Sequence, residues 1–243
     1  MAAVASAFTL TYAANAANIG YVVGSDGIVD QTFDVGWGNR LTSLGHTVTV
    51  FPQNTVSSNP SLATMNLFIV SSDVASGTFL SGIGLNQPQP IITFEYGVYD
   101  EIFGAANGTT AGAANNITIL DASSPLAAGL SGNVSVYTGG GGGSRFTLSG
   151  VSTGTDVIAS SVADPTLGVF AVLEPGEIGG GGSTWSARRM AVPAYADWDP
   201  ALVTADGWKL LDGAVAYALV PEPSSFALLG LGMAFFLARR QRR

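Results

Sequence analysis

Short apolar runs that alternate with helical stretches constrain the fold of this chain most strongly. The first hundred residues hold four such runs, each bounded by glycine, proline or polar residues: 19–23, 46–51, 67–70 and 90–94. Between the first two runs, residues 33–44 carry apolar side chains at helical spacing, and a shorter helix pattern follows the fourth run at 98–103. Strands that alternate with helices predict βαβ units and a parallel sheet.

The second half of the chain is richer in strand patterns. Strand-like runs recur there at 117–120, 134–137, 145–148, 156–160, 167–173 and 189–192. Five consecutive glycines at 139–143 and four at 179–182 predict flexible loops at hairpin ends or chain crossings. Residues 200–219 form the clearest helix pattern, and either Thr204 or Asp206 is in position to cap it.

Charge and composition exclude several functions. The chain has 17 acidic and 9 basic residues, and four of the basic residues are arginines at the C-terminus, so residues 17–219 hold 16 acids against 5 bases, a formal charge of −11. Nucleic acid phosphates need a basic footprint, so we expect no nucleic acid partner. The chain has no cysteine and a single histidine, His46, which excludes thiolate and histidine-cluster metal sites; we predict no metal and no cofactor.

The N-terminal residues 1–17 have part of the pattern of a secretory signal peptide. A modest apolar run precedes the sequence Ala-Asn-Ala at 14–16, which fits the A-x-A cleavage pattern, but a basic n-region is missing. We interpret this segment as a truncated signal peptide. The alternative is an alanine-rich leader that is disordered or loosely helical.

The last 24 residues, 220–243, form a tail in three parts. The strip Pro221-Glu222-Pro223 precedes an uncharged stretch at 224–238, which as a helix covers about 22 Å, less than the roughly 30 Å of a bilayer core. The residues that we assign to the membrane helix are Phe226, Leu228, Leu229, Leu231, Phe235, Phe236 and Leu237. The positive tail that follows is Arg239, Arg240, Arg242 and Arg243, which favours the cytoplasmic side.

This tail resembles the PEP-CTERM sorting signal in the order, spacing and position of its three parts. The resemblance implies recognition by a membrane-embedded exosortase that cuts near Pro221-Glu222-Pro223, in Gram-negative bacteria that make exopolysaccharide or biofilm. It also implies export, anchoring in the inner membrane, and then a cell-surface or extracellular location. The alternative is an ordinary C-terminal membrane anchor that no enzyme recognises.

The body, residues 18–219, resembles the class I glutamine amidotransferase-like fold and lies close to the ThuA-like group. The matching phrases are IGYVV, NRLTSLGHTVTVF, LFIVSS, IITFEYGVYDEIF, RRMAVP and ADGWKLLDGAVAYAL. The resemblance implies an α/β domain with a flavodoxin-like parallel sheet flanked by helices. In this chain a β-rich second half and a C-terminal transmembrane helix would follow.

The turn after the fourth strand is the most informative candidate site. In the resembled family this turn carries a cysteine nucleophile in a G-x-C-x-G elbow, whereas this chain reads Phe94-Glu95-Tyr96-Gly97. Glutaminase chemistry needs a thiolate, so the absence of cysteine excludes it. Glu95 remains a candidate general base or carbohydrate ligand. The alternatives are that it caps the following helix or pairs with Arg189.

Two other carboxylates are weaker candidates for the same site. Ligands of open α/β sheets bind at the carboxyl ends of the strands, and Asp30 and Asp73 follow the first and third strands there. Asp30 lacks the spacing of a calcium loop, and Asp73 lacks a nucleophile motif beside it. His46 opens the second strand, so we expect it at the opposite edge, on the surface or as a cap.

Three tryptophans complete the candidates. Trp208 lies in the last helix pattern and is expected in the core, whereas Trp185 and Trp198 lie near glycine-rich loops, where an aromatic ring can stack on a sugar. We therefore predict an exported surface or extracellular-matrix protein whose amidotransferase-like domain is non-catalytic and binds a glycan or a protein. The alternative is an exported ThuA-like hydrolase or sugar-modifying enzyme that uses Glu95 with Asp30 or Asp73.

Overall fold

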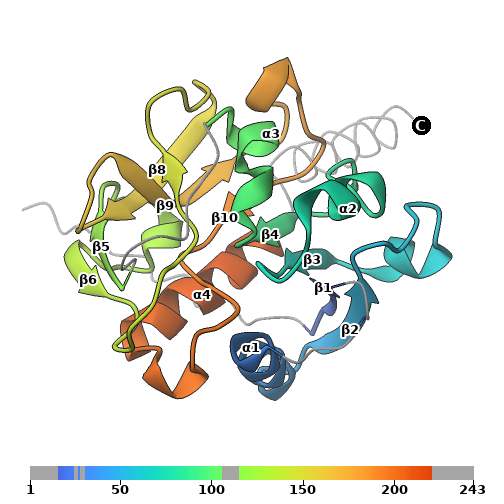
Figure 1. The fold of residues 1–243 in the computed structure, drawn as a ribbon, viewed down its shortest axis with the longest axis horizontal. Helices are drawn as coiled ribbons and strands as arrows, with labels where there is room; N and C mark the ends of the chain where they lie inside the picture. The colour runs from blue at the N-terminus through green and yellow to red at the C-terminus, as the bar shows by residue number, and fades with distance from the viewer. Residues whose placement is uncertain (1–15, 25–26, 28–30, 106–114, 221–243) are drawn as a thin grey trace, which may run out of the picture.

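A mixed β-sheet forms the centre of the protein. The computed structural model describes residues 16–24, 27, 31–105 and 115–220. Its strands lie in the order β2-β1-β3-β4-β10-β9-β8-β5-β6, and β7 pairs with β9 (Figure 1). The strands are β1 (Asn18–Val23), β2 (Thr47–Pro52), β3 (Leu67–Val70), β4 (Ile91–Thr93), β5 (Asn116–Ile119), β6 (Gly132–Ser135), β7 (Phe146–Thr147), β8 (Thr155–Ser161), β9 (Leu167–Leu173) and β10 (Arg189–Ala191).

The two longest helices lie at the two ends of the body, and the other helices are short. The α-helices are α1 (Thr32–Ser43), α2 (Ser76–Ser81), α3 (Tyr99–Phe103) and α4 (Ala205–Ala218). The 3₁₀ turns are η1 (Pro60–Thr64), η2 (Tyr96–Val98), η3 (Pro125–Ala127), η4 (Gly180–Gly182) and η5 (Pro200–Leu202). Among the described helices, none is long and apolar enough to cross a membrane. The predicted transmembrane helix lies outside the described residues.

Half of the sheet is parallel, as predicted. Strand β1 pairs in parallel with β2 and β3, and β4 pairs in parallel with β3 and β10. The remaining strands, from β9 to β6, pair antiparallel, with an irregular register between β8 and β9. The sheet is therefore mixed: the predicted parallel sheet is confirmed for β2, β1, β3, β4 and β10, and in the β-rich second half antiparallel pairing replaces helical crossovers.

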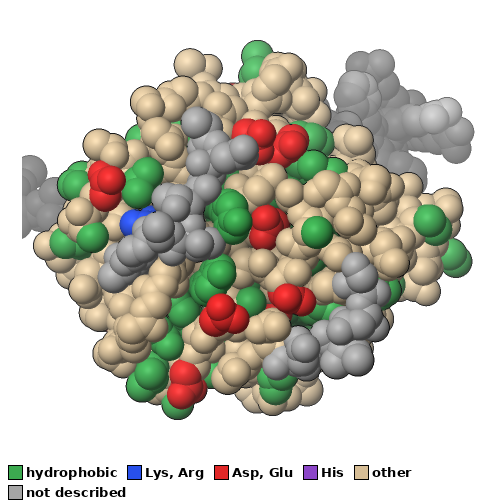
Figure 2. All heavy atoms as spheres, viewed as in Figure 1, with side chains coloured by type: hydrophobic (Ala, Val, Ile, Leu, Met, Phe, Trp, Pro, Cys, Tyr) green, Lys and Arg blue, Asp and Glu red, His purple; other side chains and the backbone are tan. Residues whose placement is uncertain are grey.

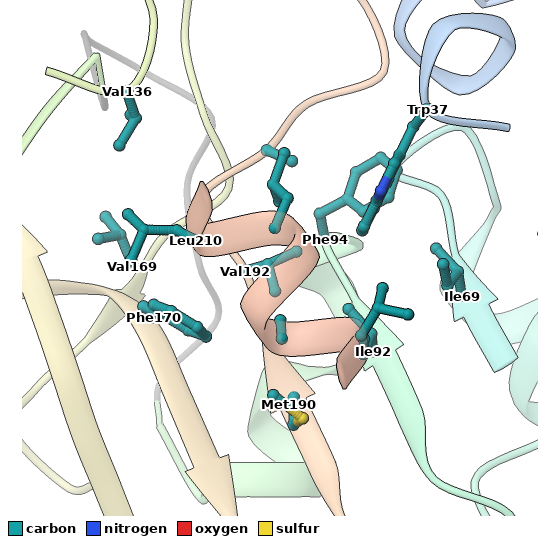
Figure 3. Packing of buried hydrophobic residues seen from close by; sticks show 14 of the residues in the cluster. Trp37, Ile69, Ile92, Phe94, Val136, Val169, Phe170, Met190, Val192 and Leu210 are labelled. Atoms are coloured by element: carbon teal, nitrogen blue, oxygen red, sulfur yellow. The ribbon is translucent and has the colours of Figure 1, made fainter. Parts of the chain in front are cut away.

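The inner parallel strands β1, β3, β4 and β10 are buried on both faces because helices cover both, whereas in the edge strand β2 only Phe51 is buried. Along β1, Tyr21 and Val23 face the layer of α1 and α4, while Val22 faces the layer of α2 and α3. This alternation of apolar residues on both faces is typical of parallel sheets. In Figure 3, Leu210 of α4 lies beside Val169 of β9 on the first of these layers.

The ends of the two longest helices show how the sequence sets their limits. Gly45, at φ +93°, adopts the left-handed conformation that follows the end of α1, in agreement with the prediction. At the other end of the body, Thr204 Oγ1 accepts a hydrogen bond from Gly207 N at 2.9 Å. Thr204, not Asp206, is thus the cap, and the predicted helix at 200–219 begins only at Ala205, after a separate 3₁₀ turn.

Candidate functional site

The carboxyl ends of β1, β3 and β4 lie at one edge of the sheet, as their parallel pairing requires. We call this the carboxyl edge. Three carboxylates gather along it: Asp34 in the first turn of α1, Asp73 after β3, and Glu95 after β4. Asp30, the third predicted candidate, lies outside the described residues. The edge therefore carries acidic groups on three separate elements, and each has a defined partner.

Asp34 is the most deeply buried of these carboxylates, at 1% exposure. Its Oδ1 accepts a hydrogen bond from Tyr21 Oη at 2.9 Å, and its Oδ2 accepts one from Ser71 Oγ at 2.6 Å. Burial raises the pKa of Tyr21 well above its ordinary value, and the neighbouring charge of Asp34 raises it further. Tyr21 thus stays protonated and remains a donor, and the helix N-terminus favours the negative charge on Asp34.

Asp73 ties the ends of two strands together. Its Oδ2 accepts a hydrogen bond from Gly24 N at 3.2 Å, directly after β1, and its own N–H donates to Ser71 Oγ at 3.0 Å. Ser71 therefore receives one hydrogen bond and donates another to Asp34. Its hydroxyl is fixed by a carboxylate and an amide, an arrangement without the imidazole that activates a serine nucleophile.

Glu95 lies in the strand-to-helix turn that the sequence indicated. Its Oε1 accepts a hydrogen bond from Gly97 N at 2.9 Å, so it caps the 3₁₀ turn η2, one of the predicted alternatives. A Cβ atom at position 97 would lie 2.6 Å from Glu95 Oε1 and 2.8 Å from Ser76 Oγ, which explains the glycine there. Glu95 is 5% exposed, and this burial raises its pKa from 4.5 to about 7, against the opposing effect of the Gly97 N–H.

The other predicted alternative for Glu95, an ion pair with Arg189, is wrong. Arg189 is the first residue of β10 and lies at the opposite, amino edge of the parallel strands. Its guanidinium donates to backbone carbonyls, among them Leu85 O at 2.6 Å and Gln87 O at 2.7 Å. His46 precedes β2 and also lies at the amino edge, as predicted, but it is buried at 5% exposure and not on the surface.

The tryptophans have three different environments. Trp198 is buried, stacks on Tyr137 with ring centroids 4.4 Å apart, and donates to Gly142 O at 2.7 Å, so its ring is already engaged. Trp208 is half-buried at the edge of the core and lies under the Arg40 guanidinium at 4.8 Å. Trp185, in contrast, lines a cavity on the α2 and α3 face of the sheet.

Three arginines of the described body, Arg40, Arg188 and Arg189, are engaged with acids or carbonyls. Arg40 forms a salt bridge with Asp212 at 2.5 Å, and Arg188 forms one with Glu174 at 2.9 Å. On the face of the described body shown in Figure 2, acidic side chains are visible in several places, whereas lysine and arginine occupy only a small area. A face of this kind repels nucleic acid phosphates, and the absence of a nucleic acid partner stays a prediction.

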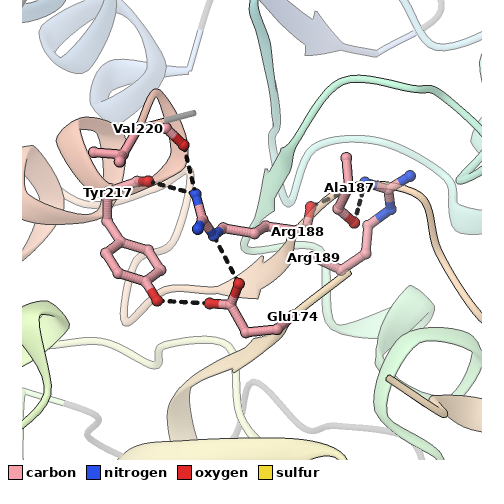
Figure 4. Close-up of polar contacts among 6 residues, drawn as sticks. All are labelled: Glu174, Ala187, Arg188, Arg189, Tyr217 and Val220. Atoms are coloured by element: carbon pink, nitrogen blue, oxygen red, sulfur yellow. Dashed lines mark hydrogen bonds and ion pairs between the residues drawn. The ribbon is translucent and has the colours of Figure 1, made fainter. Parts of the chain in front are cut away.

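Arg188 also binds backbone carbonyls at the C-terminal end of the described body. Its Nη1 donates to Tyr217 O at 3.0 Å and to Val220 O at 2.8 Å, while Tyr217 Oη donates to Glu174 Oε1 at 2.6 Å (Figure 4). Val220 is the last described residue. Because Arg188 directly precedes β10, the described chain ends at the amino edge of the parallel strands, opposite to the carboxyl edge.

Some of these contacts could not be predicted from the sequence. Tyr21 and Ser71 were not recognised as partners of Asp34, since only the fold brings residues from β1, β3 and α1 together. Asp100 and Glu101, which line the cavity with Trp185, were also missed. The sequence feature that could have indicated them is that two acidic residues stand next to each other at the start of a short predicted helix, in a chain with few charged residues.

The tail identifies the class of protein. A model of the PEP-CTERM protein-sorting motif matches residues 219–243, whereas no curated protein matches the chain. This confirms the predicted PEP-CTERM sorting motif at the C-terminus, while the roles assigned to Pro221, Glu222 and Pro223 stay predictions. The chain carries a PEP-CTERM sorting motif at its C-terminus, which implies export, C-terminal sorting or anchoring, and processing by an exosortase. The match covers the tail alone and identifies no family for the body.

Proposed function

We propose that the body, residues 18–219, is a non-catalytic binding domain that exosortase processing delivers to the cell surface or the extracellular matrix. The observation that carries this proposal is the engagement of the three carboxylates at the carboxyl edge. Asp34 receives two hydroxyls, Asp73 receives the Gly24 amide, and Glu95 receives the Gly97 amide. Groups that are fixed in this way stabilise turns and strand ends.

The resemblance of the body to the amidotransferase-like fold supports the same conclusion. The five parallel strands follow the order β2-β1-β3-β4-β10, which corresponds to the 2-1-3-4-5 order of flavodoxin-like sheets. The turn after β4 has the position of a nucleophile elbow but carries Glu95 and Tyr96 in place of a thiol. We infer that the body retains the scaffold of this fold without its nucleophile.

The position of Val220 supports an orientation of the protein at the membrane. Residues 1–17 would serve as a signal peptide, and residues 220–243 would anchor the chain in the inner membrane until the exosortase cuts near Pro221-Glu222-Pro223. Since Val220 lies at the amino edge, the carboxyl edge faces away from the anchor. A glycan or protein of the extracellular matrix would then reach the body without obstruction from the membrane.

Binding without hydrolysis tests this proposal. The full-length protein, purified in a mild detergent, is applied to immobilised polysaccharides and to surface proteins of its own host, and each bound partner is analysed for cleavage. The proposal predicts retention of a partner that remains intact. Turnover that is lost in the variant Glu95→Gln would contradict it.

One observation favours the rival function, an exported hydrolase or sugar-modifying enzyme. A carboxyl group with a pKa of about 7 is suited to general acid catalysis near neutral pH, and Glu95 has such a pKa. In this mechanism Glu95 would act with Asp30 or Asp73. The rival predicts a pH optimum near neutrality and loss of activity in both Glu95→Gln and Asp73→Asn, with the exposed-site variant Glu177→Gln as the control.

A further inference from the structure

A cavity of about 440 Å³ lies on the α2 and α3 face of the sheet, and Glu95, Asp73 and Asp34 take no part in it. Small-molecule sites in proteins are typically concave and of several hundred Å³. Its main side chains come from the α2 region, from α3 and from the loop after η4: Leu80, Leu85, Asn86, Asp100, Glu101 and Trp185. We call it the α3 cavity.

Two adjacent carboxyl groups give the α3 cavity its charge. Asp100 Oδ1 and Glu101 Oε2 are buried, and neither accepts a hydrogen bond from an N–H or hydroxyl group of the described residues. Burial is the main cause that raises the pKa of Glu101 to about 7, and the neighbouring Asp100 carboxyl contributes to the same increase. The two carboxyl groups are adjacent in sequence and have no cationic partner among the described residues that line the cavity.

The remaining walls are apolar and aromatic. Leu80, Leu85 and Trp185 line the α3 cavity, and Trp185 is 9% exposed with its indole N–H unpaired among the described residues. The Arg189 guanidinium lies 5.4 Å from the Trp185 ring, but it is fully buried and directed to backbone carbonyls. No lysine or arginine from the described part of the chain lines the cavity.

The second glycine run builds one wall of the α3 cavity. Gly180 packs so closely on α3 that a Cβ atom there would lie 1.9 Å from Asp100 O and 2.6 Å from Glu101 O. Gly179 is equally constrained, since its Cβ would lie 2.3 Å from Ile102 O. The run that the sequence predicted to be a flexible loop is therefore a close backbone contact, and it fixes the loop before Trp185 against the acidic pair.

We propose that the α3 cavity binds a small amine-bearing ligand of about the size of a hexosamine, with its ammonium group between Asp100 and Glu101. An ammonium group supplies three donors and the positive charge that the two carboxyls lack. The face of a sugar ring matches the apolar wall of Leu80, Leu85 and Trp185. A divalent cation fits less well, since it needs six or more oxygen ligands and the described residues hold no cluster of three metal-binding side chains.

This assignment rests on the proposal that the body binds a ligand, and it names the site and the ligand class. The test is isothermal titration calorimetry of the full-length protein in detergent at pH 7, with glucosamine, glucose, N-acetylglucosamine and CaCl₂ as separate probes. The charge-removing variant is Glu101→Gln, with Asp100→Asn as the second acid, and the matched control is the exposed acid Asp206→Asn. Thermal unfolding of each variant confirms that it is folded.

The proposal predicts binding of glucosamine but not of glucose or N-acetylglucosamine. We expect Glu101→Gln and Asp100→Asn each to weaken glucosamine binding about tenfold or more, since each removes a charge-assisted hydrogen bond, whereas Asp206→Asn leaves it unchanged. Equal binding of glucose, binding of Ca²⁺ alone, absence of glucosamine binding, or full glucosamine affinity in the folded Glu101→Gln variant would each overturn it. Glucosamine binding at the α3 cavity does not depend on Glu95. The partner-binding and cleavage assay described above therefore tests the proposed function independently of this calorimetric test.

Discussion

The variant Glu95→Gln is predicted to make the protein more stable, and only at neutral and alkaline pH. Glu95 has a pKa near 4.5 when unfolded and about 7 when folded, because folding buries its carboxyl group. The folded state thus binds the proton more tightly, and the stability contributed by protonated Glu95 is complete below pH 4.5 and is lost as the pH rises through 7. A pKa increase of this size corresponds to about 3 kcal/mol, at about 1.36 kcal/mol per pH unit.

Glutamine removes the charge but keeps an oxygen that can accept the Gly97 N–H, so the variant avoids this loss. Urea-induced unfolding of both full-length proteins in detergent, at pH 5 and pH 8, measures the difference. We expect a free energy of unfolding about 2–3 kcal/mol higher for Glu95→Gln at pH 8, and a difference below about 1 kcal/mol at pH 5. The matched control Glu177→Gln, at an exposed site, should show no such pH-dependent gain. A variant that is less stable than wild type at pH 8 would refute the reasoning.

Three further predictions concern the core, the glycine run and the histidine. Leu210→Ala should lower the free energy of unfolding by about 2–5 kcal/mol in urea titrations, because Leu210 is fully buried under the sheet. Gly180→Ala should lower the melting temperature, measured by circular dichroism, more than Gly182→Ala does. Of these two positions, only 180 would place a Cβ atom against the carbonyls of α3, and equal decreases would contradict this. Burial lowers the pKa of His46, although the charge of Asp212 opposes the change. The stability that neutral His46 contributes above pH 6.5 should therefore be lost on acidification. The free energy of unfolding of His46→Gln should accordingly fall less between pH 7 and pH 5 than that of the wild type.

The first half of the fold was largely predictable from local pattern. The runs that became β1, β3 and β4 are apolar and bounded by turn residues, so their burial followed from composition, and the spacing of the helical stretches indicated the parallel pairing that also includes the alternating strand β2. Helix α2 was missed, because Phe79 is its only fully buried residue and its other residues carry no apolar periodicity. Short helices of this kind are stabilised by packing, which the sequence does not display.

The second half was harder to place. The strand expected at 134–137 is β6 at Gly132–Ser135, because backbone pairing with β5, and not apolar content, sets its limits. The position of Arg189 was also mistaken: its buried guanidinium is satisfied by carbonyls at the amino edge, a role that charge pairing in the sequence does not suggest.

The two candidate sites differ in what the sequence could indicate. Glu95 was found because it lies in a strand-to-helix turn that resembles a nucleophile elbow, although its partner, Gly97, is supplied by the turn itself. The α3 cavity combines Leu80 with Asp100 and Trp185, residues far apart in the chain, so only the packed structure brings them together. Its acidic pair is visible in the sequence, but only the structure shows that no base from the described residues lines the cavity with it.

Intact-mass analysis of the protein isolated from its own bacterium tests the central claim most directly. The match to the PEP-CTERM motif at 219–243 predicts a mature chain that has lost the apolar segment and the terminal arginines and ends near Pro221-Glu222-Pro223. A cell fraction containing the exported body with this new C-terminus would agree with the account. A cytosolic protein that retains Arg243 would contradict it.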